Sequence, residues 1–451
     1  KKYMIMNGFK NYSKGWTCFL LFLCLCTWST CEAWQVEWHT KANATGPFRL
    51  DMDTVQIVEV VLKQLSITDV KAVQFYSEDM HVANVPTENI NPQPCQENLC
   101  TQINVTGVFL GKTKISCKVF FKNGTSETST DELTVTVIRR MRVLDHLFTG
   151  GVATLVAVLY INFGAAIDWK AAANIIRKPI GPAVCFVSQF LFMPLISYAL
   201  GRVLFPNNHE MALGLFFTGV SPAGGASNIW TFILGGNLDL SVTMTTISTI
   251  AAFGMMPLWI FTLGKHIFES GDLAVPYDKI GMYAAALVLP LAIGFCIQKY
   301  LPRVTRILVR ILKPASTILI LFIIIFATVT NLYMFELFSW QIVVAGLGLP
   351  WLGYLAGFIG GKALKQPPGD VLAIAIETGI QNTGISIFLL RFTLPQPEGD
   401  LTTVVPVAVA IMTPVPLMLL YFIKLCKKRF CMGPDQVPLK KDNSSTMMTA
   451  P

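Results

Sequence analysis

The sequence carries little charge for its length. Only 14% of its 451 residues are charged, whereas 53% are hydrophobic, and a soluble domain usually carries about 25% charged residues. This balance excludes a disordered chain, a nucleic-acid-binding domain and an ordinary cytosolic enzyme. A helix that spans a bilayer needs roughly 20 apolar residues. The composition therefore predicts a polytopic protein whose partner is the lipid bilayer and not a nucleic acid.

Histidine is scarce, and the cysteines lack metal-binding spacing. The five histidines fall outside the long apolar windows described below, and the eleven cysteines form no C-x-x-C pattern. A zinc or other transition-metal site is therefore not expected. The sequence also offers no recognisable set of nucleophile, base and acid, so we predict no enzyme activity and no organic cofactor.

Residues 1–33 are typical of a secretory signal peptide. Several lysines precede a short apolar core at residues 18–28, and the small residue Ala33 follows that core. This order of basic leader, apolar run and small residue is what signal cleavage requires. An uncleaved anchor helix is the alternative, but such a short apolar run favours cleavage.

Residues 34–145 predict a β-rich domain. Polar and apolar residues alternate at 54–61, 115–121 and 133–138. Alternation over short runs rich in β-branched residues, separated by Gly, Asn and Pro, is typical of an antiparallel β-sandwich.

Glycosylation sequons place this β-rich domain on the extracellular side. They begin at Asn43, Asn104 and Asn123, whereas residues 146–430 contain no sequon. In an oxidising compartment, three cysteines of the domain would form one disulfide and leave one thiol. These are Cys95, Cys100 and Cys117, and the sequence does not say which two pair.

Residues 146–425 predict a transporter-sized membrane domain, followed by a cytoplasmic tail at 426–451. Its nine apolar windows are 147–167, 179–201, 211–236, 240–264, 280–298, 314–335, 339–361, 371–390 and 401–423. If the β-rich domain is outside, sixteen Lys and Arg residues fall on the cytoplasmic side and four on the other. This agrees with the positive-inside rule. Three arginines at 139, 140 and 142 break the rule. A cleaved signal peptide would override their effect, because it commits the β-rich domain to the outside first.

Two of the nine windows contain helix-breaking and polar residues near their middle. One includes Ser221-Pro222-Ala223-Gly224-Gly225, and the other runs from Glu377 to Gly384. Backbone released from helical bonding inside a bilayer needs other partners, which a cavity or an ion supplies. A pair of broken spans in the two halves of a chain indicates the substrate site of a transporter.

A weak internal symmetry supports this interpretation. Pro194, Thr218 and Pro257 recur as Pro350, Thr378 and Pro414, at offsets of 156, 160 and 157 residues. Because the two sets cross the membrane in opposite directions, the repeat would be inverted.

Glu377 is the one charged residue inside the nine windows. A charge at the centre of a bilayer costs ~3 kcal/mol or more, so this carboxylate needs a cation or a proton. The windows contain no Lys or Arg partner, while amides and hydroxyls surround Glu377 in the two broken spans. Such oxygen ligands suit a hard cation. The alternative is a protonated structural carboxyl group.

Three segments carry a resemblance to a known family. They are 220–258, 377–382, and 178–195 with its Lys178-Pro179-Ile180-Gly181 start. Together and in this order they resemble the sodium/bile acid cotransporter family over residues 145–425. The long glycosylatable N-terminal domain resembles one subgroup of that family.

The resemblance implies a core domain with two sodium sites beside two crossing broken helices, and a panel domain that moves against it. The first site would use Ser227, Asn228, Ser241, Thr245 and Glu377. The second would use Gln189, Glu377 and Gln381 with nearby backbone carbonyls. The residues next to substrate would be Pro222, Gly224, Gly225, Asn382 and Thr383. Sodium is the only metal implied.

The sequence therefore predicts a sodium-coupled symporter of an organic anion, such as a bile-acid-like solute or a steroid sulfate, in the plasma membrane. The N-terminus would be outside and the C-terminus cytoplasmic. The alternative is a membrane receptor or scaffold whose ectodomain binds a partner and whose transport core is vestigial.

Overall fold

The computed structural model describes residues 34–40, 48–95, 98–140, 142–166, 179–271, 273, 276–330, 335 and 337–431. The chain divides into two compact units at Arg140 and Met141. The predicted signal peptide, the sequon at Asn43 and most of the predicted tail lie outside the described residues.

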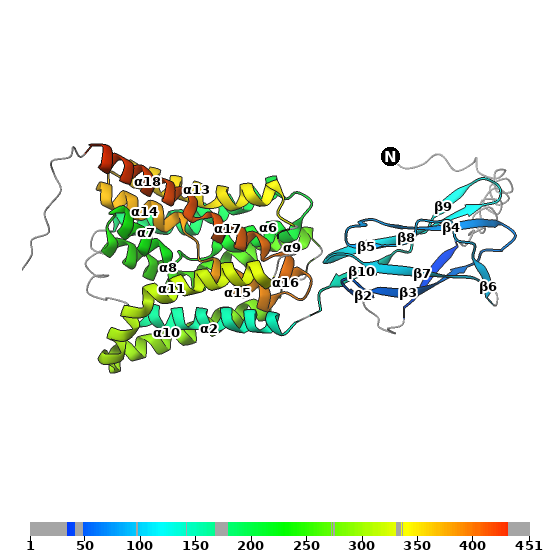
Figure 1. Cartoon of the computed structure of the whole chain (residues 1–451), viewed down its shortest axis with the longest axis horizontal. Helices are drawn as coiled ribbons and strands as arrows, with labels where there is room; N and C mark the ends of the chain where they lie inside the picture. Colours follow the sequence, from blue (N-terminus) through cyan, green and yellow to red (C-terminus); the bar gives the residue numbers. More distant parts are fainter. Residues whose placement is uncertain are drawn as a thin grey trace, which may run out of the picture. The chain divides into compact units, whose positions relative to one another are not determined.

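The first unit is a β-sandwich of two five-stranded sheets (Figure 1). One sheet has the order β1-β3-β7-β5, with β6 paired to β7; its strands are β1 (Gln35–His39), β3 (Val55–Lys63), β5 (Ala83–Asn84), β6 (Gln93–Cys95) and β7 (Asn98–Gly107). The other has the order β2-β10-β8-β4, with β9 paired to β8; its strands are β2 (Phe48–Asp51), β4 (Val70–Ser77), β8 (Gly111–Phe121), β9 (Ser126–Thr128) and β10 (Leu133–Ile138). Among the described strands, β2 and β10 are the one pair that runs parallel.

One apolar core joins the two sheets. Val58 and Val60 of β3 lie in the same buried cluster as Phe75 of β4 and Val119 of β8. Along β8 the buried positions alternate with less buried ones, because successive side chains of a strand point to opposite faces. The three alternating runs of the sequence correspond to β3, β8 and β10. Cys95 and Cys100 form a disulfide, and Cys117 is a buried free thiol.

The second unit is a helical bundle (Figure 1). Its first half contains α2 (Val143–Ala166), α4 (Ile180–Val187), η1 (Ser188–Phe192), α5 (Met193–Leu204), α6 (His209–Val220), α7 (Ala226–Leu234), α8 (Leu238–Trp259), η2 (Ile260–Gly264) and α9 (Lys265–Ser270). Its second half contains α10 (Tyr277–Tyr300), α11 (Pro302–Thr330), α13 (Trp340–Ala363), α14 (Pro368–Gly379), α15 (Thr383–Thr393), α16 (Glu398–Leu401), α17 (Val404–Met412) and α18 (Pro414–Cys431).

Six helical segments are long and apolar enough to cross a membrane, as expected of an integral membrane protein. They coincide with six of the nine apolar windows. Two further windows are the broken pairs α6/α7 and α14/α15, whose halves have only 9 to 12 residues each. The remaining window, 314–335, overlaps the second half of α11. The criterion of helix length and composition thus identifies six of the nine expected spans.

Local sequence explains both breaks. Ser221 is extended, with φ −70° and ψ 158°, because the residue before a proline is disfavoured in the α region. The second break begins at Ile380, which is also extended. Asn382 then caps α15, its side-chain oxygen accepting a hydrogen bond from Ile385 N at 3.3 Å.

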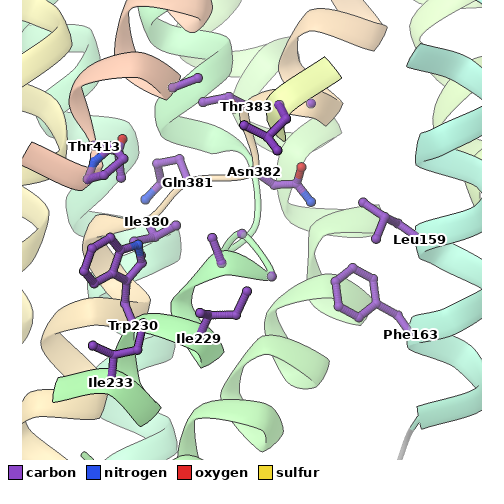
Figure 2. A pocket seen from close by; sticks show the side chains of 17 residues that line it. Leu159, Phe163, Ile229, Trp230, Ile233, Ile380, Gln381, Asn382, Thr383 and Thr413 are labelled. Atoms are coloured by element: carbon purple, nitrogen blue, oxygen red, sulfur yellow. The ribbon is translucent and has the colours of Figure 1, made fainter. Parts of the chain in front are cut away.

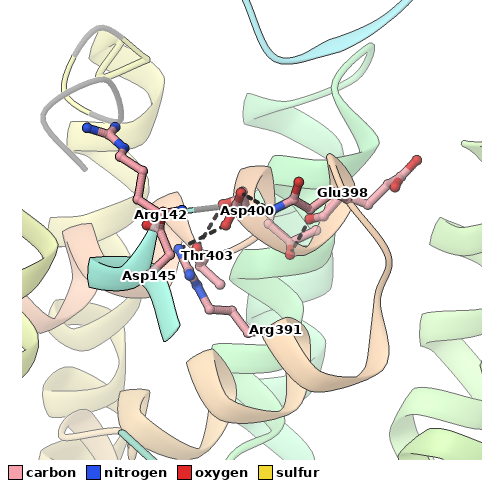
Figure 3. Close-up of polar contacts among 8 residues, drawn as sticks. Arg142, Asp145, Arg391, Glu398, Asp400 and Thr403 are labelled. Atoms are coloured by element: carbon pink, nitrogen blue, oxygen red, sulfur yellow. Dashed lines mark hydrogen bonds and ion pairs between the residues drawn. The ribbon is translucent and has the colours of Figure 1, made fainter. Parts of the chain in front are cut away.

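A charged cluster fixes the turn after α15 (Figure 3). Arg391 and Asp400 form an ion pair of 2.9 Å, and their side chains are 6% and 4% exposed. Thr403 Oγ1 donates to Asp400 O at 2.7 Å. We call this the Arg391 end of the bundle. The opposite end carries the turn after α7 and the start of α14, where Asn237 N donates to Gly369 O at 3.0 Å; we call it the Gly235 end.

Candidate functional site

The two breaks lie side by side and pair with each other. Ala223 and Gln381 form an isolated antiparallel β-bridge. Gly224 N donates to Ile380 O, and Asn382 N donates to Pro222 O, both at 2.8 Å. Each break therefore satisfies backbone groups that the other has released, as non-helical backbone at membrane depth requires.

Glycine at 224 permits this close approach. A Cβ atom there would lie 2.8 Å from the carbonyl oxygen of Gln381, which is closer than side-chain carbon atoms come. Ala223 N is satisfied separately, by the hydroxyl of Ser248 at 2.9 Å. Ser248 thus supports the first break from α8.

Glu377 is fully buried next to this crossing and is surrounded by hydroxyl groups. Ser241 Oγ donates to Glu377 Oε2 at 3.0 Å, and Thr245 Oγ1 donates to Glu377 Oε1. Ser227 faces the same carboxyl group. Three residues from α7 and α8 thus converge on one carboxyl group of α14.

Asn228 completes the first predicted ligand set. Its Oδ1 lies 2.8 Å from Ser241 Oγ and 3.4 Å from Thr245 Oγ1. Each of those hydroxyls has a single proton, yet each also faces Glu377. Thr245 Oγ1 additionally lies 3.0 Å from Ser241 O. Acceptor oxygens therefore outnumber the hydroxyl protons between them, an arrangement that favours a cation.

Gln189 and Gln381 form a second polar pair on the other side of the crossing. Gln189 Nε2 donates to Gln381 Oε1 and to Ser221 O, both at 2.7 Å. Gln381 Nε2 donates to Thr378 O, also at 2.7 Å. The amide oxygen of Gln381 is thus taken by an amide donor, so this pair is not arranged around an ion. Glu377 accepts its hydrogen bonds from Ser241 and Thr245 of the first ligand set.

Gln189 lies in a local irregularity of its span. The π-helical turn η1 interrupts the helix there, as such turns frequently do at functional sites. Trp259 Nε1 donates to Phe190 O at 2.6 Å and so holds the wider turn. The pattern of apolar residues in the sequence contains no signal for this turn.

A cavity of about 260 Å³ opens beside the crossing (Figure 2). Four of the five predicted substrate-adjacent residues line it, namely Gly224, Gly225, Asn382 and Thr383. Pro222 contributes instead to the pairing of the two breaks. No charged residue occurs among the described residues that line the cavity.

The walls of the cavity are apolar, and they were not anticipated from the sequence. Leu159 and Phe163 of α2 face Ile229 and Trp230 of α7 across it (Figure 2). Apolar residues are expected throughout a membrane span, so nothing in the sequence distinguishes these four. The N-terminal ends of α7 and α15 also line the cavity, and a helix N-terminus carries partial positive charge.

Comparison with known proteins agrees with the expected family. Residues 153–336 match the Sodium Bile acid symporter family. The chain is 32% identical over 264 residues to the ileal sodium/bile acid cotransporter of Oryctolagus cuniculus, covering 58% of this chain and 74% of that protein.

Two further relatives show the range of the similarity. The sodium-dependent organic anion transporter of Bos taurus is 32% identical over 55% of this chain and 66% of its own length. The P3 protein of Homo sapiens is 29% identical over 57% of this chain, which spans about half (54%) of that protein. The cotransporters among these relatives are named for sodium-coupled transport and not as enzymes. Since the match covers 74% of a relative that is 32% identical, the chain belongs to the sodium/bile acid symporter family.

Proposed function

We propose that this protein is a sodium-coupled symporter of an organic anion that works by alternating access. The observation that carries the proposal is the buried set of oxygen atoms around Glu377, in which acceptors outnumber hydroxyl protons. A sodium ion bound there would supply the missing positive charge. Carboxylate, amide and hydroxyl oxygens are the ligands that a hard cation prefers.

The first sodium site would consist of Ser227, Asn228, Ser241, Thr245 and Glu377. The second would consist of Gln189, Gln381 and Glu377 with backbone carbonyls near Thr378 and Ile380. In the second site the two glutamine amides must turn their oxygens towards the ion, because they now bond to each other and to backbone carbonyls. Sodium binding would thereby tighten the crossing from both sides.

The cavity suits an anion with an apolar body. Its described lining lacks charged side chains, while Trp230, Ile229, Leu159 and Phe163 offer apolar surface. The two helix N-termini and the adjacent sodium ions would stabilise the anionic group. Bile-acid-like solutes and steroid sulfates combine these properties, and relatives are named for bile acids and organic anions.

The proposed topology has nine spans related by an inverted repeat. Thr218 and Thr378 support it, since both occupy the last turn of a half-helix before a break and bond to the carbonyl four residues earlier. The β-sandwich would be extracellular and glycosylated, following cleavage of residues 1–33. The Gly235 end would be cytoplasmic, and the protein would reside in the plasma membrane.

A transport assay tests the proposal. Cells expressing the protein should accumulate labelled steroid conjugates or small organic acids in sodium but not in choline medium. Two sodium ions with one monovalent anion would move positive charge inward, so voltage clamp should record an inward current. Substrate binding to the ectodomain without any sodium-dependent uptake or sodium binding would favour a receptor or scaffold instead.

A further inference from the structure

The Thr231 hydroxyl of α7 differs from most other threonine hydroxyls described in the helical unit. Helical threonines commonly donate to the carbonyl four residues earlier, and many do so here: Thr218, Thr243, Thr245, Thr246, Thr249, Thr378, Thr393, Thr402 and Thr413. Thr231 Oγ1 has no hydrogen-bond partner among the described residues, although Thr231 is 0% exposed. Ser227, one turn earlier, faces Glu377. Burying a hydroxyl without a partner is unfavourable, so the Thr231 oxygen needs an explanation.

Both residues belong to the buried face of α7. That face consists of Ser227, Asn228, Thr231 and Leu234, and α7 packs against α8 and α14. Four residues make about one helical turn. Thr231 therefore lies one turn from Ser227, in the direction of the Gly235 end.

Thr231 of α7 lies at the level of Ala373 of α14, which is one helical turn from Glu377. A Cβ atom on Gly236 would meet the methyl group of Thr231 at 2.8 Å and the backbone nitrogen of Ala373 at 3.5 Å. Ala373 precedes Glu377 by four residues. The side chain of Thr231 is thus placed between the Glu377 site and the Gly235 end.

An acidic group stands at the end of this line. Asn237 Nδ2 donates to Asp370 Oδ1 at 2.7 Å, and both residues are half-buried. Oxygen-bearing side chains therefore recur along both helices, at Ser227 and Thr231 of α7 and at Glu377 and Asp370 of α14. Lys424 Nζ, which donates to Leu234 O at 2.8 Å, lies beside the same end. A cation that exchanges ligands stepwise avoids complete loss of coordination in the low-dielectric interior.

We propose that the Thr231 hydroxyl is a transient sodium ligand on the path between the first sodium site and the Gly235 end. The inference rests on the proposed sodium coupling and adds a route to it. Ser227 would bind the ion at rest, and Thr231 would bind it during entry or release. The absence of a bond to the Ser227 carbonyl keeps the Thr231 oxygen available for this role.

Sodium itself is the probe that tests the path. The full chain is purified into lipid nanodiscs, loaded with ²²Na⁺ and diluted into unlabelled sodium to measure release. Thr231→Val keeps the shape of the side chain and removes the hydroxyl. We expect it to slow release about tenfold while equilibrium affinity changes by less than about threefold.

Two variants control the measurement, and a third tests the other end of the path. Thr231→Ser retains the hydroxyl and should release sodium at the wild-type rate. Thr243→Val removes a buried hydroxyl that is already bonded to Asp239 O and should also leave release unchanged. Asp370→Asn tests the path from its half-exposed end, and should slow sodium association about threefold by removing a charge that attracts the cation.

Several results would overturn the inference. The proposed path is wrong if monodisperse Thr231→Val releases sodium at the wild-type rate and Asp370→Asn binds sodium at the wild-type rate. Equal slowing by Thr231→Ser, which keeps the hydroxyl, would show that the effect does not depend on that hydroxyl. An affinity loss in Thr231→Val as large as that of Ser227→Ala makes Thr231 a resident ligand. If wild type binds ²²Na⁺ and Glu377→Gln does not, the proposed function stands even when the path fails; no sodium binding by wild type rejects both.

Discussion

Ser241 Oγ donates a hydrogen bond to Glu377 Oε2 at 3.0 Å, although 136 residues separate the two in the chain. The contact joins α8 to α14 at the level where both broken helices cross. The same hydroxyl oxygen lies 2.8 Å from Asn228 Oδ1. One proton cannot satisfy both acceptors. A cation bound between them would supply the missing positive charge.

Removing the charge of Glu377 should abolish sodium binding. Glu377→Gln keeps the size of the side chain and one of the two oxygens that accept from Ser241 and Thr245, but its amide cannot offset a bound cation. We expect loss of ²²Na⁺ binding and of sodium-driven uptake at normal surface expression. Asp278→Asn, at an exposed carboxylate of α10, serves as the control. Wild-type sodium dependence in Glu377→Gln would identify a protonated structural carboxyl group and reject the first site.

Single amide ligands should matter less than the carboxylate. Asn228→Ala and Gln381→Ala each remove one oxygen ligand, which should raise the half-maximal sodium concentration about tenfold. Because the two proposed sites share Glu377, the loss in the double variant should depart from the product of the single losses. Sodium titrations of binding or uptake measure both quantities. Unchanged titrations in both single variants would contradict the ligand assignments.

The crossing should not tolerate a side chain at Gly224. In Gly224→Ala the new Cβ would lie 2.8 Å from Gln381 O, which is backbone and cannot turn away. We expect a loss of stability of about 1–3 kcal/mol, seen as a lower melting temperature, together with weaker sodium binding. Gly254→Ala is the matched control, because nothing lies within 4 Å of its Cβ position. Equal behaviour of the two variants would refute the close-approach argument.

The buried thiol of the β-sandwich should be unreactive in the folded protein. Burial raises the pKa of Cys117 from 9.0 to about 12, and only the thiolate is a good nucleophile. Peptide mapping after iodoacetamide treatment at pH 8 should find Cys117 unmodified in native protein and modified after denaturation. Rapid native labelling at pH 8 would contradict the buried placement.

The same shift affects stability at alkaline pH. Below about pH 9 the thiol is protonated in both states, so it does not oppose folding. As pH rises from about 9 towards 12, the unfolded thiol ionises first and the folded state is progressively disfavoured. If wild type is more stable than Cys117→Ala at pH 8, the melting temperatures of the two proteins should therefore converge as pH rises through this window. A constant difference between the two proteins would contradict the raised pKa.

Glycan mapping tests the proposed sidedness. Asn104 and Asn123 are exposed on the β-sandwich, and Asn43 lies outside the described residues. Glycosidase should reduce the mass of the expressed protein, and replacing each of the three asparagines by Gln should remove one glycan. The tail contains a further sequon, Asn443-Ser444-Ser445, and Asn443→Gln should leave the mass of the glycans unchanged. A glycan on Asn443 alone would invert the topology.

Several features of this protein follow from the sequence alone. The β-strands could be predicted because alternation with period two already separates their buried and exposed faces, as β8 illustrates. The breaks at Ser221 and Ile380 were predictable in position because Pro222 and the adjacent glycines constrain the backbone locally. Glu377 stood out because a charge within an apolar window is costly wherever the window packs.

Other features depend on contacts between distant segments, which only the tertiary structure decides. The pairing of Cys95 with Cys100 depends on the path of the chain between β6 and β7. The bridge between Ala223 and Gln381 and the orphaned hydroxyl of Thr231 depend on how α7 lies against α14. Hydropathy records whether a residue is apolar but not which neighbour it faces, so the cavity wall of Leu159, Phe163 and Trp230 emerged only when the helices were packed together.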